Sequence, residues 1–354
     1  SAASDVYKRQ EQEGCVKLVG LRSATFRLTN GTRQGSVLSP TLFSSYLDDL
    51  LVQLRQLGVG CYIGGVWVGA AGYADDIILT ALSRTAMALM LEKCEQYASE
   101  HNLDPDPKKC LYMTGTMTNV SYPTKLKLDS KDLPWVETAT HLGHELHQQC
   151  DMTYDCKTKK GQFIGTSTDI RESFSFAHPD QVLNAVNVYA SHFYGAMLWD
   201  FTSDMCGQFC RSWNTRVKLA WDVPRSTHTY LIENLFGINH VSHKKQLLAR
   251  YVNFFKNLLK SISKEVQVVA NIVARDIRSV TGKNLAYIEQ ETKLDPWKAT
   301  SVQVKDAVPN SQVPPQDQWR LPLLCQYIYQ RQEMKVQCQE TKEITKLIDS
   351  LCSS

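Results

Sequence analysis

The chain has 354 residues, of which 43% are hydrophobic and 21% are charged, and its formal net charge is +3. This composition excludes a fully disordered protein, and the length predicts two or three domains of about 100–200 residues each. No run of about 18 uncharged apolar residues occurs, so we predict no membrane-spanning helix and no membrane partner. The 11 cysteines include no Cys-x-x-Cys pair, which is typical of reduced thiols in an intracellular protein.

The N-terminal region is predicted to hold a leader and a short β-rich segment. Residues 1–10 (SAASDVYKRQ) lack the apolar core of a secretory signal and look like a translated cDNA-library adaptor. We therefore expect this leader to be non-native. Residues 15–30 show short β-type alternation that ends at the turn signal Asn30-Gly31.

A loop and a helix follow and form the first candidate site. Ser39 is expected to cap this helix, Pro40 to take its first position and Gly58 to end it. Gly35 permits a close backbone approach before the helix N-terminus, and Arg33 adds a planar fork of donors. These features suit an anionic or ribose-bearing ligand, and they also fit an ordinary capped helix.

A glycine-punctuated, β-rich stretch over residues 61–82 forms the second candidate site. Apolar, strand-like residues flank the adjacent acids Asp75 and Asp76 on both sides, which predicts a strand–turn–strand hairpin. We expect the hairpin tip to present the two carboxylates close together and partly shielded. Such a pair either takes up a proton or recruits a cation, and Mg²⁺ prefers a few carboxylates together with substrate phosphates. Ser83 is expected to cap a further helix, so the strand–helix–hairpin–helix order indicates an α+β fold.

A second tetrapeptide of the same pattern lies earlier in the chain. Tyr46-Leu47-Asp48-Asp49 falls within the helix predicted after Pro40, where neighbouring side chains point about 100° apart. We expect these acids to face water and to have no catalytic role.

The C-terminal half is predicted to be mainly helical. Short strands and turns are expected over 110–150, one continuous amphipathic run over 180–199, and one or two helices over 244–280. Five aromatic residues in this half could stack bases, but a helical core is the favoured interpretation: Trp199, Phe201, Phe209, Trp213 and Trp221.

Two parts of this half are candidates for binding phosphates. Residues 244–283 carry nine Lys and Arg against two acids, and Lys256, Lys260 and Lys264 recur at helical spacing on one face. Arg225, in a turn, is a further candidate for a phosphate contact. A solvated helix face is the competing interpretation of such clustering.

The two candidate sites together resemble motifs of a known protein family. RQGSVLSPTLF, followed about forty residues later by YADDIIL, resembles motifs B and C of reverse transcriptases, and in particular those of non-LTR (LINE-type) retrotransposons of the RTE-like lineage. The resemblance covers roughly residues 15–240 and includes four further motifs: DPDPKKC (104–110), LPWV (133–136), HLGHEL (141–146) and VKLAWDVPRSTHTYL (217–231).

The resemblance implies a partial right-hand polymerase palm with a helical thumb and roles for the candidate residues. Asp75 would be a ligand of catalytic Mg²⁺ (or Mn²⁺) and Asp76 a supporting acid and ligand, with the Tyr73 ring near the primer end. Lys108 or Lys109 would neutralise or protonate the pyrophosphate leaving group. The pocket for the nucleotide and the template would be lined by Arg33, Gln34 and Gly35.

The resemblance also implies the partners, the location and the domain organisation. The partners would be an RNA template, a DNA primer and a dNTP, and the protein would act in the cytoplasm and nucleus. The expected regions are a leader (1–10), a partial palm (11–120), the palm end and thumb-like region (121–240), a basic helical region (241–307), a Pro-rich linker (308–322) and a C-terminal helix (323–354).

One departure from the family pattern affects the expected activity. A two-metal polymerase needs an aspartate from motif A, upstream of the Arg33 loop. Of the acids there, Asp5 lies in the leader, and Glu11 and Glu13 lack a β-rich flank. We therefore expect a C-terminal fragment of a reverse transcriptase that is inactive alone. The alternative is a non-catalytic RNA- or DNA-binding remnant that uses the thumb and the basic helices.

Zinc is a minor alternative at two places. His141, His144, His147 and Cys150 recur at three-residue spacing, but a strand would send neighbouring side chains to opposite faces. The second pattern has a gap too long for a familiar zinc finger; its residues are Cys206, Cys210, His240 and His243.

Overall fold

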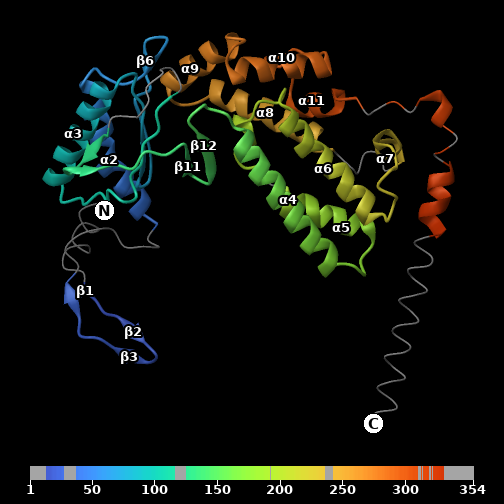
Figure 1. Cartoon of the computed structure of the whole chain (residues 1–354), viewed down its shortest axis with the longest axis horizontal. Coiled ribbons are helices and arrows are strands. Elements are labelled where there is room, and N and C mark those ends of the chain that lie inside the picture. The colour runs from blue at the N-terminus through green and yellow to red at the C-terminus, as the bar shows by residue number, and fades with distance from the viewer. Residues whose placement is uncertain are drawn as a thin grey trace. The chain divides into compact units, whose positions relative to one another are not determined.

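The computed structural model divides the chain into two compact units. It describes residues 13–27, 37–115, 125–191, 193–235, 242–309, 312, 314–318, 320 and 322–330. The first unit comprises Ser1–Cys110 and Lys125–Leu133, and the second comprises Leu111–Thr124 and Pro134–Ser354. Both contain helices and small antiparallel hairpins, so the predicted α+β class is confirmed (Figure 1). The six domain boundaries expected from the sequence stay predictions.

The first unit opens with two short hairpins. β1 (Glu13–Gly14) pairs with β4 (Phe26–Arg27), and β2 (Lys17–Leu18) pairs with β3 (Leu21–Arg22). This pairing agrees with the β-type alternation of the sequence, although each strand is only two residues long. The leader lies outside the described residues.

Helix α2 (Ser39–Gln56) begins one residue earlier than expected. Leu38 is the N-cap and makes no side-chain capping bond, so the prediction that Ser39 caps the helix was wrong. The end of the helix was predicted correctly. Gly58 follows with φ +68°, a left-handed conformation that favours glycine, and its N–H bonds the carbonyl of Arg55.

Two further hairpins follow α2 in place of the one expected. β5 (Tyr62–Ile63) pairs with β6 (Val66–Trp67), and β7 (Ala70–Tyr73) pairs with β8 (Asp76–Leu79). The Thr80 N–H donates to the Gly69 carbonyl at 2.7 Å, and the Cys61 N–H donates to the Thr80 carbonyl at 3.2 Å. These bonds join the two hairpins. A side chain at Gly69 would lie 2.5 Å from the Trp67 ring, which is why this connection needs glycine.

Helix α3 (Arg84–Glu100) completes the core of the first unit. The Ser83 hydroxyl accepts from the Ala86 N–H at 3.1 Å, which confirms the predicted N-cap. A small core cluster of this unit contains the buried side chains of Leu50, Leu54, Met90 and Tyr97. A hairpin of β9 (Lys127–Leu128) and β10 (Lys131–Asp132) belongs to the same unit.

The second unit begins with a hairpin and a long helix. β11 (Thr138–His141) pairs with β12 (His144–His147), and α4 (Thr153–Ser173) follows. Short strands and turns were predicted here, and the structure confirms them. The His141/His144/His147/Cys150 spacing therefore belongs to a strand hairpin, as the sequence favoured.

The predicted continuous helix over 180–199 is interrupted. α5 (Pro179–Ala185) runs into a π-helical turn (Val186–Ala190), and a short 3₁₀ turn (Ala196–Leu198) follows a break. Gly195 has φ +76° in this break, and a side chain there would overlap the His144 ring. The interruption thus depends on a contact with a hairpin fifty residues away, which the helical periodicity does not reveal.

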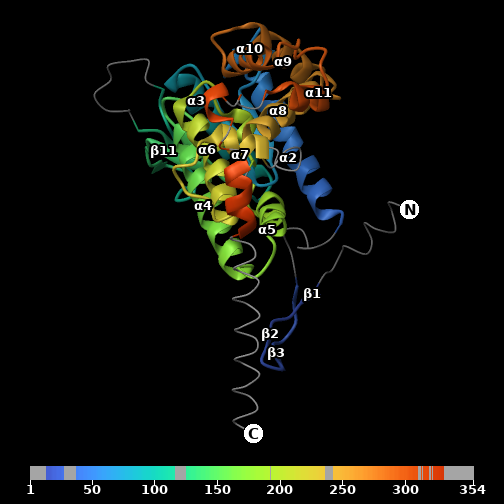
Figure 2. The same cartoon turned by 90° about the vertical axis from the view of Figure 1, so that its right-hand side faces the viewer.

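Helices make up the remainder of the second unit. They are α6 (Asp204–Ala220), α7 (Thr229–Leu235), α8 (His243–Leu259), α9 (Lys264–Arg275), α10 (Val280–Thr292) and α11 (Ser301–Ala307), followed by a 3₁₀ turn (Pro315–Asp317). Figure 2 shows α8, α9, α10 and α11 together at one end of this unit. Residues 322–330 are also helical, so the described part of the predicted C-terminal helix has the expected conformation.

A large aromatic core holds the helices together. The five aromatic residues singled out in the sequence are all buried: Trp199, Phe201, Phe209, Trp213 and Trp221. They form a core as predicted and are not available for base stacking. His243 is buried among four of the core aromatics, and burial lowers its pKa to about 3, so the ring is neutral at physiological pH.

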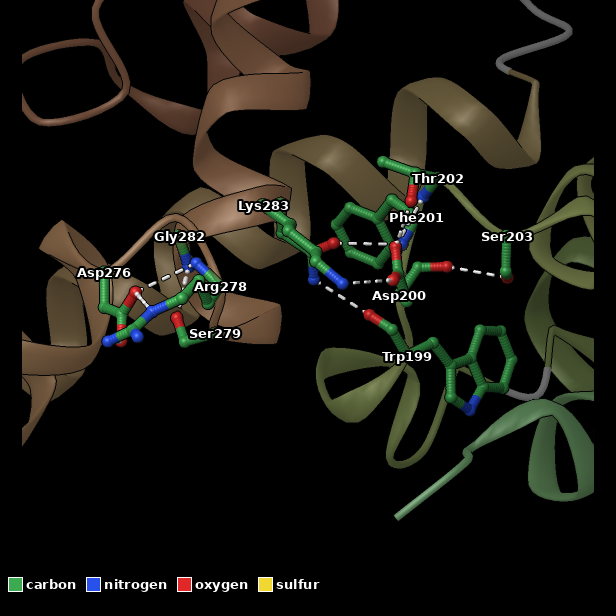
Figure 3. Close-up of polar contacts among 11 residues, drawn as sticks. Trp199, Asp200, Phe201, Thr202, Ser203, Asp276, Arg278, Ser279, Gly282 and Lys283 are labelled. Atoms are coloured by element: carbon green, nitrogen blue, oxygen red, sulfur yellow. Dashed lines mark hydrogen bonds and ion pairs between the residues drawn. The ribbon is translucent and has the colours of Figure 1, made fainter. Parts of the chain in front are cut away.

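Polar contacts fasten α10 to the segment before α6 (Figure 3). Asn284 is fully buried, donates to the Trp199 carbonyl at 2.8 Å and accepts from the Phe201 N–H at 2.9 Å. Lys283 lies 3.7 Å from Asp200 in the same place. The basic helices are therefore packed firmly onto the aromatic core.

The three lysines expected on one helix face do not lie on one helix. Lys256 is in the last turn of α8, Lys260 is its C-cap, and Lys264 is the first residue of α9. Ser263 caps α9 and so separates the two helices. In the residues described, no helix is both long and apolar enough to cross a membrane.

Candidate functional site: the Tyr73–Asp76 hairpin

The Tyr73-Ala74-Asp75-Asp76 tetrapeptide forms the tip of the β7–β8 hairpin. Tyr73 pairs directly with Asp76, so Ala74 and Asp75 make a two-residue turn. Ala74 has φ 51°, in the left-handed region that costs a non-glycine residue about 1–2 kcal/mol. The predicted hairpin is therefore confirmed, and its turn places the acid pair at the tip.

Cross-strand pairing also sets the directions of the side chains. Residues directly opposite each other in an antiparallel pair point to the same face, so the Tyr73 ring and the Asp76 carboxylate share one face. The Tyr73 side chain is 67% exposed, and Asp75 and Asp76 are exposed as well. The expectation that the carboxylates are partly shielded was wrong, because only the base of the hairpin packs against other residues.

Helix α2 supports the base of the hairpin. β7 packs on α2, and a side chain built at Gly72 would lie 3.7 Å from the Leu51 side chain. Ile77 and Leu79 of β8 pack against the small core that α2 and α3 share. The hairpin tip is thus carried on a half-buried base and faces solvent.

The second tetrapeptide has a different structure. Tyr46-Leu47-Asp48-Asp49 lies within α2, where Leu47 is buried and the two acids are exposed. Asp49 accepts from the Gln53 side chain at 2.9 Å, one helical turn away. The expectation of a solvated helix face is confirmed.

The two candidate lysines lie in a separate loop of the same unit. The Lys108 N–H donates to the Asp106 carboxylate and the Lys109 N–H donates to the Asp106 carbonyl, each at 3.0 Å. Both side chains are exposed. Among the described residues, no hydrogen bond or ion pair joins either lysine to the hairpin, so the choice between them stays open.

The residues of the other motif cannot be placed in this site. Arg33, Gln34 and Gly35 lie outside the described residues. The helix that they precede does begin where the motif requires, at Ser39.

The donor set of the hairpin suits a divalent cation bound together with a phosphate ligand. Mg²⁺ is commonly held by one or two carboxylates plus substrate phosphates, which is what Asp75 and Asp76 offer. No group of three His, Cys, Asp or Glu side chains able to hold a metal occurs in the described part of the chain. The described part includes the three histidines of the β11–β12 hairpin and Cys150. It also includes Cys206, Cys210 and His243 of the second zinc pattern, whereas His240 lies outside it.

Sequence reasoning missed the residue that fixes the HLGHEL hairpin. Asp155 on α4 is 1% exposed; its carboxylate accepts from the Trp199 indole at 2.7 Å and from the Glu145 N–H at 3.2 Å, and lies 3.5 Å from His144. Buried charges in proteins are normally paired or hydrogen-bonded in this way. No local pattern singles out Asp155, because its partners lie up to 44 residues away.

Comparison with known proteins identifies the region that contains this hairpin. Residues 9–166 match the family described as "Reverse transcriptase (RNA-dependent DNA polymerase)". The chain is 28% identical over 129 residues to the Pol polyprotein of a type-1 R2 retrotransposable element of Nasonia vitripennis, which covers 36% of the chain. It is 34% identical over 91 residues to the corresponding polyprotein of a type-2 R2 element of Drosophila melanogaster, which covers 26% of the chain.

These matches show which domain contains the hairpin and how much of each relative the chain covers. The matched segments are 12% and 8% of the length of the two relatives, so the chain corresponds to a small part of each. The family match contains both candidate motifs and the hairpin tip. Residues 9–166 are therefore a reverse transcriptase domain that is related, at low identity, to the Pol proteins of non-LTR R2 retrotransposons.

Proposed function

We propose that this domain adds deoxynucleotides to a DNA primer on an RNA template and that the β7–β8 hairpin is its catalytic element. The observation that carries the proposal is the hairpin turn, which presents two adjacent exposed carboxylates beside an exposed tyrosine ring, on a base that packs against α2. Polymerisation needs carboxylates at a primer terminus that is open to a long, charged substrate. An exposed tip meets that requirement, whereas a buried acid pair does not.

Each residue has a proposed role. Asp75 and Asp76 hold Mg²⁺ (or Mn²⁺), which when bound neutralises phosphate charge and activates the primer hydroxyl. The Tyr73 ring packs against the terminal primer nucleotide, on the same face as Asp76. Lys109, or its neighbour Lys108, neutralises the pyrophosphate that leaves. Arg33, Gln34 and Gly35 line the pocket of the incoming dNTP and the template base.

We expect the 354-residue chain alone to be inactive in DNA synthesis. A pair of metal ions needs carboxylates beyond the adjacent pair, and in the described residues no third acidic ligand joins Asp75 and Asp76. Nucleic-acid binding without catalysis is the second candidate function, and the excess of basic residues over 244–283 favours it. The RTE-like lineage and action in the cytoplasm and nucleus are also proposals.

Photo-crosslinking tests the catalytic assignment without requiring turnover. A DNA primer that ends in 4-thiothymidine, annealed to RNA, is expected to crosslink to the peptide that contains Tyr73. The Tyr46 peptide serves as the matched control, because it carries the same pattern in a helix. Crosslinking confined to other peptides would contradict the proposed position of the primer end.

Primer extension on homopolymer RNA tests the expected inactivity and the role of Asp75. We expect no synthesis by the chain alone, with or without Asp75→Asn, while primer–template binding persists in both. Synthesis that requires Asp75 would establish the polymerase and overturn the expected inactivity. Synthesis that survives Asp75→Asn would overturn the role of Asp75.

A further inference from the structure

Helices α4 and α6 run parallel and in register in the second unit. The Lys160 ammonium donates to the Gln208 side chain at 2.7 Å, and the Arg216 guanidinium donates to the Thr168 hydroxyl at 3.0 Å. Both bonds join residues 48 positions apart, so the two helices keep the same offset for two turns or more. Their C-terminal ends therefore lie at the same end of the unit, where α5 also packs (Figure 1).

Three segments meet at this end. The ring of His178, just after α4, packs edge-on against Trp221 at the end of α6, with ring centroids 5.4 Å apart. The Lys218 ammonium of α6 donates to the Arg225 carbonyl at 3.2 Å and fixes the turn that carries Arg225. Arg171 lies on α4 one turn beyond Thr168, the partner of Arg216.

Arg216 is at the centre of this arrangement and its side chain is only partly satisfied. One terminal nitrogen bonds Thr168, but the Nε atom is buried and has no hydrogen-bond partner. Burial, followed by the charges of Arg225 and Arg171, lowers the pKa of Arg216. The guanidinium groups of Arg225 and Arg171 are therefore neighbours of Arg216 at the end of the unit where α4 and α6 meet.

Four basic side chains at this end form no ion pair with a described acidic residue. In the described part of the chain, no ion pair involves Arg171, Arg216, Lys218 or Arg225. The other arginine of α6, Arg211, is bonded to Asp204 at 3.1 Å. The unpaired cations of α6 therefore lie toward its C-terminal end, near Arg171 and Arg225.

We propose that Arg171, Arg216 and Arg225 form a binding site for backbone phosphates of a nucleic acid. An arginine offers a planar fork that bonds a phosphate through two N–H groups, and an anion held by three such forks offsets their mutual repulsion. Arg171 and Arg225 are exposed and can reach a ligand, while Arg216 is held in place by Thr168. The choice of nucleic acid as the source of the phosphate rests on the proposed function.

The site differs from the basic surface expected from the sequence. Lys256, Lys260 and Lys264 belong to two helices, and the Lys256 ammonium is already bonded to the Lys298 carbonyl at 3.0 Å. The arginine site also lies outside residues 244–283, where the sequence shows its largest basic excess. Two of its residues, Arg171 and Arg216, lie outside every motif found in the sequence.

Salt-dependent binding of the full chain to a fluorescein-labelled 20-base-pair RNA–DNA hybrid, without divalent metal or dNTP, tests the site. Each lost phosphate contact lowers the slope of log affinity against log salt by about 0.9 and the affinity by about eightfold at 0.1 M salt. We expect this loss for Arg171→Gln and for Arg225→Gln, both exposed and therefore harmless to folding. Arg216→Lys is expected to weaken binding without changing the net charge, because lysine lacks the fork.

Arg211→Gln is the matched control, since it also removes one exposed arginine charge, from the helix that carries Arg216, and is expected to leave affinity and slope unchanged because Arg211 is paired with Asp204. Unchanged binding by Arg171→Gln and Arg225→Gln would overturn the site, and so would an equal loss in Arg211→Gln. Inorganic phosphate at 10 mM, about one tenth of the 0.1 M salt, distinguishes the source: a site for free phosphate would lose hybrid binding at this concentration, whereas the proposed backbone site retains it. The binding assay tests only the arginine site, and the primer crosslink to Tyr73 tests only the proposed function of the hairpin. Either proposal can therefore fail while the other stands.

Discussion

The two Tyr-x-Asp-Asp tetrapeptides differ in structure although they differ in only one letter. Residues 46–49 lie in α2, where Leu47 is buried and the acids point into solvent along a helix. Residues 73–76 form a hairpin tip, with a left-handed residue at the second position. The flanking residues decide the outcome: a helical apolar period surrounds the first, and β-branched and glycine residues surround the second.

This difference shows why a short motif needs its structural context. In the helix, the two acids are successive positions on a regular surface, and Asp49 interacts with Gln53 one turn away. In the hairpin, the turn brings the tetrapeptide to the end of a rigid element and puts the tyrosine and the last acid on one face. Only the second arrangement can approach a substrate from one side.

Removal of both carboxylates from each tetrapeptide is expected to give the largest difference. Asp75→Asn with Asp76→Asn should weaken Mn²⁺ binding, in the presence of the hybrid and a dNTP, by at least about tenfold, because affinity of oxygen sites depends strongly on ligand charge. Electron paramagnetic resonance of free Mn²⁺ measures this change. The double variant Asp48→Asn, Asp49→Asn is the matched control and should bind Mn²⁺ like the parent chain. An equal loss of Mn²⁺ affinity in both double variants would contradict a metal-binding role that is specific to the hairpin.

Glycine at the second position of each tetrapeptide should change stability in opposite directions. Leu47→Gly removes a buried side chain and weakens the helix, which should lower the free energy of unfolding by about 3–5 kcal/mol. Ala74→Gly relieves the left-handed backbone and should raise it by about 0.5–1 kcal/mol. Hydrogen exchange in urea, resolved for peptides of α2 and of the hairpin, measures both. A destabilising Ala74→Gly would show that the turn is not left-handed at this residue.

Loss of the tyrosine hydroxyl should give the smallest difference. The Tyr46 hydroxyl donates to the His101 carbonyl at 2.7 Å, so Tyr46→Phe should cost about 0.5–1 kcal/mol of stability. Tyr73 is exposed at the tip, so Tyr73→Phe should change stability by less than about 0.5 kcal/mol. Thermal unfolding monitored by circular dichroism compares the two. Equal losses would indicate that the Tyr73 hydroxyl has a partner of its own.

Features with a local cause could be predicted from the sequence. Gly58 ends α2 because a left-handed residue is needed there, and Ser83 caps α3 through a bond to a residue three positions away. The Asp75 turn was found in the same way, from the strand-like residues on both sides. The burial of Trp199 and Phe209 was also expected, since a core position was the favoured interpretation of these aromatic residues.

Features with a distant cause could not be predicted. The break at Gly195 exists because the His144 ring occupies the space of a side chain, and Arg216 meets Thr168 across 48 positions. The lysine stripe was a different kind of error, because Ser263 is a local helix start that the periodicity of the lysines concealed. The exposure of Asp75 was also misjudged, since burial of a turn depends on what packs over it.

Iron-mediated cleavage tests the central claim most directly, because it locates a bound cation on the chain. Fe²⁺ in place of Mg²⁺, with peroxide and ascorbate, cuts the backbone next to the metal in a complex with the RNA–DNA hybrid and a dNTP. We expect cuts next to Tyr73, Asp75 and Asp76 that disappear in the Asp75→Asn, Asp76→Asn variant. Cuts at Asp48 and Asp49, or cuts that persist in that variant, would contradict the assignment of the hairpin as the metal-binding element.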